Sequence, residues 1–374
     1  MHADLRQRSR SMRAAVLFEQ GKPMRVEEVE LAPPQYGEVR VQMVAGGICH
    51  SCLHAADGSW QGIPVPIVLG DEGAGVVEEV GPGVRDLEVG DHVILSWAPT
   101  CGRCYYCSTG RPVLCERGPE SVGVLLDGTT RMSLGGESVH HFASVATYAS
   151  HSVVPESCAI RIRDDMPLDK AALIGCSVMT GVGSVINTAR VRPGESMAVF
   201  GVGGIGLNAI QGGGLVSAHP SIAVDVNPQK LEYARGLGAS HLVDASNEDP
   251  VGAIRRITGR GAEYTFAAVG DARAFAQARD ALAPGGTCVL IGVPPSGQDF
   301  TYEAGLLGDG ERVIRGSRYG SARTRADFPR LVELYLAGKL KIDELITNRY
   351  GLEEANEAFR ALAAGEVARG LIVF

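Results

Sequence analysis

The sequence predicts a two-domain α/β protein, with a β-rich domain followed by a doubly wound parallel sheet. Its 374 residues exceed the length at which a single hydrophobic core stops growing. Apolar and polar residues alternate in short runs through the first third of the chain, which is typical of antiparallel strands. From about Thr180, short apolar strand runs alternate with helical segments. That alternation favours a parallel sheet covered by helices.

The composition limits the classes of partner. The net charge is −8, and no dense Lys/Arg block occurs, so nucleic acid and anionic membranes are not expected partners. No uninterrupted run of about 20 apolar residues occurs, which predicts no membrane span. We expect residues 1–12 to form a disordered extension, since they carry three arginines and no apolar segment. Nine cysteines without a signal peptide favour metal-binding or catalytic thiols and a cytoplasmic location.

The first chemical cluster follows strands predicted within residues 13–45. Residues 46–54 hold two thiols, two imidazoles and one hydroxyl, on a loop that we expect to enter a short helix. A thiolate is a good zinc ligand, and a hydroxyl followed by a histidine can pass a proton. Further strands are predicted near residues 67–81 and 89–95.

Four cysteines then occur within fifteen residues, and the gaps between them are two, two and seven residues. Four thiolates at this spacing can close a tetrahedral zinc site that has no open position, which makes the site structural. An iron–sulfur cluster uses similar spacings, but structural zinc is favoured. The four ligands are Cys101, Cys104, Cys107 and Cys115.

A glycine-rich turn follows the strand run at residues 196–200. Its glycines allow close approach of the backbone to a pyrophosphate at the start of a helix. A second strand ends at Asp225, which is 19 residues after the last motif glycine. An acid there accepts hydrogen bonds from ribose hydroxyls and repels a 2′-phosphate, so NAD is favoured over NADP. The motif glycines are Gly201, Gly203, Gly204 and Gly206.

The rest of the chain continues the βα alternation and ends in a helical tail with a final strand. Strands are predicted at residues 241–244, 264–270, 287–293 and 370–374, and helices at 228–237, 272–282, from 326 onward, and 355–362.

Together, the four-cysteine lobe, the Gly-x-x-Cys-His start and the Gly-x-Glu-Gly-x-Gly string of residues 70–75 resemble the zinc-dependent medium-chain alcohol dehydrogenases. Residues 127–131, 140–142 and 175–181 resemble the longer, dimeric branch, which includes liver-type and glutathione-dependent formaldehyde dehydrogenases. The resemblance implies a GroES-like catalytic domain at 13–179 and 321–374, with a zinc lobe at 99–117. It also implies a Rossmann domain that binds NAD at 180–320.

The same resemblance implies a catalytic zinc held by Cys49, Asp71 and Cys176, with a fourth position left open. Asp71 departs from the family, which has a histidine at this position. Two thiolates and a carboxylate leave the bound ion at net −1, which makes it a weaker Lewis acid. The neighbouring acid of the family is replaced by Cys52. Cys52 is interpreted either as a small buried residue beside the ligands or as an alternative thiolate ligand, and Glu72 is expected behind the metal.

The resemblance assigns roles to further residues. Ser51 is expected to take the alcohol proton and His54 to pass it to solvent. Arg318 replaces a usually apolar position and is expected either to hold a substrate anion or to face solvent or the dimer partner. The remaining expected cofactor contacts are His50, Lys230, Val293 and Arg369. The remaining expected pocket residues are Trp60, Trp97 and Phe142, and Val293 is expected to line the pocket as well.

The sequence therefore predicts an NAD-dependent alcohol dehydrogenase with two zinc ions per chain, a small-molecule alcohol or aldehyde substrate and a homodimeric assembly. Two alternatives remain at this stage. The altered metal site favours a reductase of a conjugated alkene or iminium, although the intact pair of Ser51 and His54 argues against it. The other alternative is an NAD-binding protein without catalysis.

Overall fold

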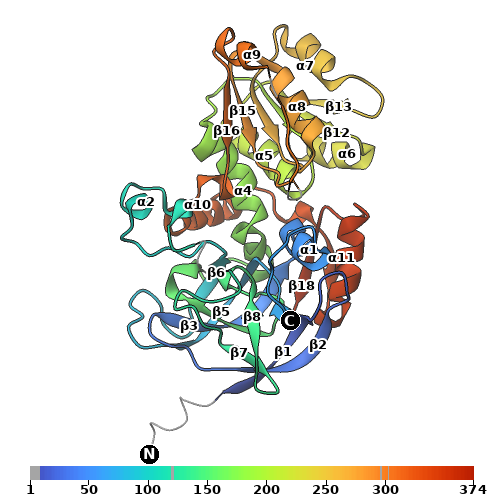
Figure 1. Ribbon diagram of the computed structural model, residues 1–374. Helices are drawn as coiled ribbons and strands as arrows, with labels where there is room; N and C mark the ends of the chain where they lie inside the picture. Colours follow the sequence, from blue (N-terminus) through green and yellow to red (C-terminus); the bar gives the residue numbers. More distant parts are fainter. Residues whose placement is uncertain (1–8, 119–121, 295–296, 302) are drawn as a thin grey trace, which may run out of the picture. The chain divides into compact units, whose positions relative to one another are not determined.

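The computed structural model describes residues 9–118, 122–294, 297–301 and 303–374 (Figure 1). The chain forms two compact units. Unit 1 contains the residues up to Cys176, Arg323–Ala337 and Ile342–Phe374, and unit 2 contains Ser177–Ala322 and Gly338–Lys341. The short segment Gly338–Lys341 belongs to unit 2 because Gln211 hydrogen-bonds both the backbone carbonyl and the backbone N–H of Lys341, at 2.9 and 2.8 Å.

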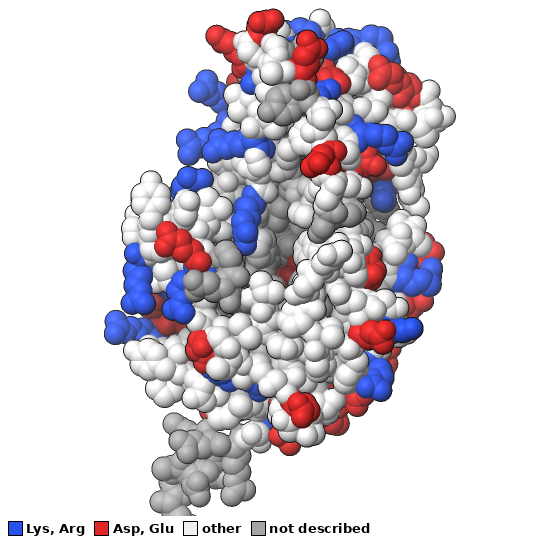
Figure 2. Space-filling model, in the orientation of Figure 1, with Lys and Arg blue, Asp and Glu red and all other residues white. Residues whose placement is uncertain are grey.

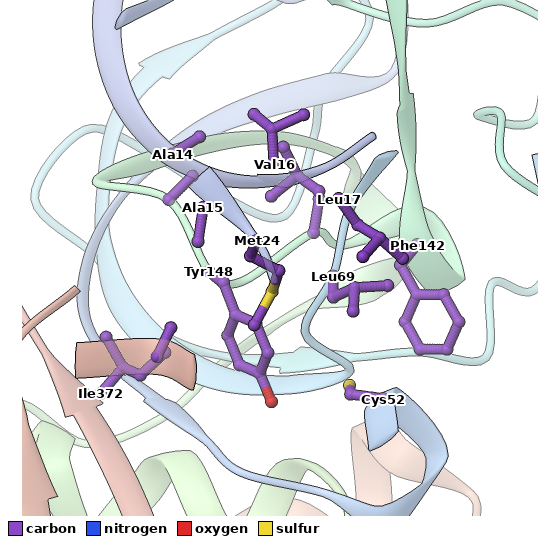
Figure 3. Packing of buried hydrophobic residues seen from close by; sticks show 14 of the residues in the cluster. Ala14, Ala15, Val16, Leu17, Met24, Cys52, Leu69, Phe142, Tyr148 and Ile372 are labelled. Carbon is purple, nitrogen blue, oxygen red and sulfur yellow. The ribbon is translucent and has the colours of Figure 1, made fainter. Parts of the chain in front are cut away.

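Unit 1 contains a closed β-barrel, as alternating apolar residues in its strands favour. Its core is filled by side chains of β1 together with Leu69, Phe142 and Tyr148, which Figure 3 shows packed with Cys52. In barrel order the strands are β1 (Arg10–Leu17), β2 (Arg25–Leu31), β7 (Met132–Leu134), β8 (Glu137–His141) and β4 (Ile67–Val68).

A second, seven-stranded sheet of unit 1 includes the last strand of the chain. Its C-terminal strand β18 (Arg369–Val373) pairs antiparallel with β3 (Glu38–Gly47), so that Leu371 faces Gly47. The other strands are β5 (Glu72–Val80), β6 (His92–Ser96), β9 (His151–Pro155), β10 (Ala159–Arg161) and β17 (Ile346–Tyr350). The α-helices of unit 1 outside the cysteine lobe are α1 (His50–Asp57), α3 (Leu168–Ala171), α10 (Thr324–Leu336) and α11 (Ala355–Ala363).

The expected disordered extension is too long at its C-terminal end. Strand β1 begins at Arg10, and Met12 pairs with Val29 of β2. Met12 is buried in the barrel core. The polar residues Arg10 and Ser11 concealed this start, because the apolar alternation begins only at Met12. Residues 1–8 of the predicted extension lie outside the described residues.

Unit 2 is a six-stranded parallel sheet with helices between its strands, which confirms the predicted fold class. In sheet order the strands are β13 (His241–Asp244), β12 (Ser221–Asp225), β11 (Met197–Phe200), β14 (Ala262–Ala267), β15 (Leu282–Leu290) and β16 (Val313–Gly316). The α-helices are α4 (Ser177–Gly183), α5 (Gly204–Leu215), α6 (Pro228–Gly236), α7 (Pro250–Thr258), α8 (Ala272–Asp280) and α9 (Ala304–Gly308). The edge strand β16 escaped prediction because it is short and largely exposed.

Charged side chains of both signs are interspersed over the face shown in Figure 2. This distribution agrees with the absence of a dense basic block in the sequence. Within the described ranges, no single helix is long and apolar enough to cross a bilayer. Only the consecutive helices Leu168–Gly175 and Ser177–Ala189, taken together, reach such a length and composition.

Candidate metal centres and dinucleotide site

Three potential metal ligands that are far apart in the sequence meet inside unit 1. The ligand atoms of Cys49, Asp71 and Cys176 all lie within 4.8 Å of one another, and all three residues are buried. The Sγ atoms of Cys49 and Cys176 are 3.9 Å apart. Two thiolates on a tetrahedral zinc lie about 3.8 Å apart, since each Zn–S bond is about 2.3 Å. The cluster therefore has the donor types and the spacing of a zinc site with three protein ligands.

The electrostatics of the cluster favour a cation. The hydrogen bond with Cys176 and the charge of Arg369 hold the pKa of the Cys49 thiol well below its usual range. Burial and the negative charge of Cys49 raise the pKa of Asp71 well above its usual range. Three acidic groups buried together thus compete for protons, and a divalent cation can replace those protons.

Two glycines fix the backbone beside the ligands. Gly70 has φ +105°, and a Cβ there would lie 2.2 Å from Oγ1 of Thr147. A Cβ on Gly175 would lie 2.7 Å from the carbonyl oxygen of Leu95. Only glycine fits at positions 70 and 175. These two glycines therefore fix the backbone that leads into Asp71 and Cys176.

A buried ion pair lies next to the metal ligands. Glu72 and Arg369 are 0% and 3% exposed, and Arg369 Nη2 pairs with Glu72 Oε1. A Cβ on Gly47 would lie 2.3 Å from the same oxygen, so glycine at 47 leaves room for the carboxylate. Arg369 reaches this place because β18 pairs with β3.

Cys52 contacts the cluster from the first helix of unit 1. It lies one turn after Cys49 on α1 and is fully buried. Its Sγ donates to Oδ1 of Asp71 at 3.5 Å. Burial and the charge of Asp71 raise the pKa of this thiol well above its usual range. The three-ligand group does not include it.

Ser51 and His54 lie on the same helix, three residues apart, so they share one side of α1. Ser51 Oγ lies 3.5 Å from the sulfur of Cys49. His54 is half-buried, and its ring lies 5.8 Å from that of Trp60. The Nδ1 atom of His54 is buried and has no hydrogen-bond partner among the described residues. The neighbouring His50 is exposed.

The four-cysteine lobe forms a second candidate metal centre in unit 1. The sulfur atoms of Cys101, Cys104, Cys107 and Cys115 lie within 4.8 Å of one another. The lobe contains α2 (Tyr105–Ser108) and the 3₁₀ helix Pro112–Leu114. These two short helices lead the chain from Cys107 back to the other cysteines at Cys115. Backbone hydrogen bonds lower the pKa of Cys104 to about 6, which favours the thiolate that a metal binds.

The glycine-rich turn of unit 2 has the geometry of a pyrophosphate-binding turn. A Cβ on Gly206 would lie 1.9 Å from the carbonyl oxygen of Gly201, whereas Gly203 has no neighbour within 4 Å of that position. Gly206 thus permits close packing, and Gly203 leaves the turn open to a ligand. Gly204 begins α5, directly after this opening.

Asp225 ends β12 beside the same turn. Its Oδ2 accepts a hydrogen bond from the backbone N–H of Val202 at 2.8 Å, and its Oδ1 accepts one from Asn227 at 2.9 Å. A cavity of about 280 Å³ adjoins it. The cavity is lined by Phe200, Gly201, Val224, Asp225, Val226, Ala245, Val269, Asp271, Arg273, Ala274 and Gln277.

Comparisons with known proteins identify the family. An alcohol dehydrogenase GroES-like domain model matches residues 35–164, and a zinc-binding dehydrogenase model matches residues 204–337. The chain is 42% identical to the alcohol dehydrogenase class-3 of Cereibacter sphaeroides, over 97% of this chain and 99% of that protein. The chain belongs to the zinc-dependent alcohol dehydrogenase family. It is an oxidoreductase of the NAD-dependent alcohol dehydrogenase type, with zinc and NAD as cofactors.

Other members of the family extend the comparison. The S-(hydroxymethyl)glutathione dehydrogenase of Paracoccus denitrificans is 39% identical, over 97% of this chain and 99% of that protein. The crystal structure of the benzyl alcohol dehydrogenase of Acinetobacter calcoaceticus has a TM-score of 0.93 at 32% identity, over 98% of this chain and 99% of that chain. These likenesses confirm the predicted family and its glutathione-dependent branch.

The expected pocket residues and the expected cofactor contact Lys230 fall into both units. Trp60, Trp97 and Phe142 lie in unit 1, in or against the apolar cluster that contains Cys49 and Cys176. Lys230, Val293 and Arg318 lie in unit 2, where Lys230 is half-buried and the other two are exposed.

Several residues around the site escaped prediction. Tyr148 donates a hydrogen bond to the carbonyl of Gly47 at 3.0 Å, and Thr147 donates one to the carbonyl of Glu72 at 2.9 Å. No local pattern marks either residue, because both act through long-range contacts. Asp271 and Arg273, which line the cavity beside Asp225, could have been found, since residues after parallel strands collect at that edge of the sheet.

Proposed function

We propose that this alcohol dehydrogenase oxidises an alcohol to an aldehyde or ketone at a zinc held by Cys49, Asp71 and Cys176. The convergence of these three buried side chains carries the proposal. Zinc, when bound, supplies a Lewis acid that lowers the pKa of an alcohol hydroxyl. NAD, when bound, would supply the hydride acceptor.

The surrounding charges tune this centre. Two thiolates and one carboxylate exceed the charge of a divalent ion by one unit. The positive charge of Arg369 acts on both proposed ligands: it helps to lower the pKa of Cys49, and it opposes the rise in the pKa of Asp71 that burial and Cys49 cause. Arg369 thus offsets part of the excess, although its pairing with Glu72 limits the effect.

The proton leaves through the first helix of unit 1. Ser51 lies beside the ligand Cys49 and takes the hydroxyl proton, and His54 passes it on from three residues later. An imidazole with one nitrogen unpaired among the described groups is suited to this exchange.

Other side chains hold the cofactors in place. Four thiolates leave no open position, so we assign Cys101, Cys104, Cys107 and Cys115 to a structural zinc. The glycine turn from Gly201 to Gly206 binds the pyrophosphate, and Asp225 binds the adenosine ribose. His50, Lys230, Val293 and Arg369 remain the proposed further cofactor contacts.

For the substrate, we propose an uncharged alcohol with an apolar or aromatic body. Trp60, Trp97 and Phe142 pack in the apolar cluster that includes two of the metal ligands, and they offer little polar surface. The second candidate is S-(hydroxymethyl)glutathione, which the names of two similar proteins favour.

A steady-state assay with NAD separates these substrates. We expect benzyl alcohol to give a higher kcat/KM than ethanol and than formaldehyde mixed with glutathione. A higher value for the glutathione mixture would replace the first substrate class with the second. Metal analysis is the companion measurement, and a single zinc that persists in Cys49→Ser and disappears in Cys107→Ser would overturn the proposed catalytic centre.

We also propose that the enzyme is a cytoplasmic homodimer. All nine cysteines are free, which fits a reducing compartment. Strand β16 is an edge of the unit 2 sheet with exposed residues, so it offers a surface to which a second copy can pair.

A further inference from the structure

Cys52 contacts Asp71, although Cys52 is not one of the proposed metal ligands. Cys52 is 0% exposed, and its sulfur lies 3.5 Å from Oδ1 of Asp71. It is outside the three-residue metal group, which contains Cys49, Asp71 and Cys176. The question is what a buried thiol does beside a carboxylate that binds a metal.

The two oxygens of Asp71 face different partners. Oδ2 lies 3.8 Å from the sulfur of Cys176, on the side of the metal ligands. Oδ1 lies on the side of Cys52 and accepts its S–H. A carboxylate whose first oxygen is held by a donor presents the second oxygen to a metal.

The backbone leaves Asp71 little freedom to change this arrangement. Asp71 is 3% exposed and follows Gly70, whose φ of +105° and contact with Thr147 fix the start of the side chain. Burial limits rotation about the first side-chain bond, so the main remaining freedom is rotation of the carboxylate group about its last bond. The S–H of Cys52 is placed to restrict that rotation.

Restricting the rotation of the Asp71 carboxylate affects how many of its oxygens can bind a metal. A carboxylate can bind a metal through one oxygen or through both. With two thiolates already bound, an aspartate that used both oxygens would complete four-coordination and fill the position that the alcohol needs. An aspartate that uses one oxygen leaves this position open.

We propose that Cys52 is a positioning residue whose S–H holds Oδ1 of Asp71, so that this ligand binds zinc through Oδ2 alone. This inference rests on the proposed function, because it requires a catalytic zinc on Asp71. Cys52 thereby orients Asp71 by acting as a hydrogen-bond donor. A neutral thiol suits a carboxylate, which has no N–H to donate and accepts hydrogen bonds.

The competing explanation is that Cys52 only fills space in the apolar cluster around it. The variants Cys52→Ala and Cys52→Ser separate the two roles. Serine keeps a hydroxyl donor but is a poor core residue, whereas alanine removes the donor and remains apolar. For both variants we would measure zinc affinity by competition with a chromophoric chelator, and the zinc coordination shell by X-ray absorption at the zinc edge. Thermal unfolding checks that each variant is folded.

We expect Cys52→Ala to bind the catalytic zinc about 10-fold or more weakly and to show an added oxygen in the zinc shell. Cys52→Ser should recover most of the affinity and the original shell. The proposal is overturned if alanine matches the wild-type affinity and shell, or if serine is no better than alanine. Loss of one sulfur from the zinc shell in both variants would instead make Cys52 a ligand and overturn it too. A wild-type enzyme without a second zinc would overturn the proposed function as well.

Discussion

At the residue scale, the unusual feature is an aspartate among the proposed metal ligands. The carboxylate of Asp71 is buried. One of its oxygens accepts a hydrogen bond from Cys52, and the other lies on the side of Cys176. A neutral imidazole in this position would leave a zinc with two thiolates uncharged, whereas an aspartate ligand would leave it at net −1. The proposed ligand change would therefore weaken the Lewis acid and strengthen the binding of the cation.

We predict that Asp71→Ala loses one of two zinc ions and lowers kcat/KM by more than about 100-fold. Loss of a residue that only supports a metal ligand lowers metal affinity or activity by about 10- to 100-fold, and loss of the ligand itself should have a larger effect. Asp71→His should keep both zinc ions and equal or exceed the wild-type kcat, because the metal becomes a stronger Lewis acid. Metal analysis and steady-state kinetics measure both effects. Asp164→Ala, at an exposed position, is the control and should change neither. Unchanged zinc content in Asp71→Ala would exclude Asp71 as a ligand.

At the element scale, helix α5 contains glycines with opposite roles. A Cβ on Gly206 would overlap the backbone of Gly201, and one on Gly213 would lie 2.4 Å from the sulfur of Met197. Gly214, near the end of the helix, has no neighbour within 4 Å of that position. Close packing explains Gly206 and Gly213, and nothing in the structure explains Gly214.

The contrast gives a matched pair of variants. Gly206→Ala should displace the turn and weaken NAD binding by about 10-fold or more, because the collision is with backbone and corresponds to a loss above about 1.4 kcal/mol. Gly214→Ala should leave NAD binding unchanged and raise stability by up to about 1 kcal/mol, since alanine favours a helix over glycine. Fluorescence titration with NADH and thermal unfolding test the pair, and equal effects of the two substitutions would contradict this account.

At the scale of the whole molecule, the exposed strand β16 bears on assembly. Val313 on this strand is 48% exposed, although valine favours burial. An exposed sheet edge invites pairing with another copy, and a two-fold axis would place β16 against itself.

We therefore predict a dimer in sedimentation velocity and a shift of Val313→Asp toward monomer, since like charges would meet across the axis. Val89→Asp is the matched control because Val89 is also exposed, at 63%, and lies in unit 1. A wild-type monomer at micromolar concentration, or a fully dimeric Val313→Asp, would refute this interface.

The sequence alone determined what depends on local spacing. The gaps of two, two and seven residues brought Cys101 to Cys115 into one lobe, and the order of strand, glycine turn, helix and acid identified the turn at Gly201 and the place of Asp225. It also indicated the two-part fold, because periodicity is a local property of the chain. The start of β1 was misplaced at 13 because Arg10 and Ser11 are polar residues on an exposed edge of the pairing.

Tertiary structure decided what depends on contacts across the chain. The assignment of Asp71 and Cys176 to a metal came from resemblance alone. The fold brings them together with Cys49 because Gly175, the residue before Cys176, packs against Glu72 at the start of β5. The pairing of Arg369 with Glu72 exists only because the last strand returns to β3. The tertiary structure also decided the position of Cys52 against one oxygen of Asp71. The order of residues in the sequence does not indicate this hydrogen bond of 3.5 Å.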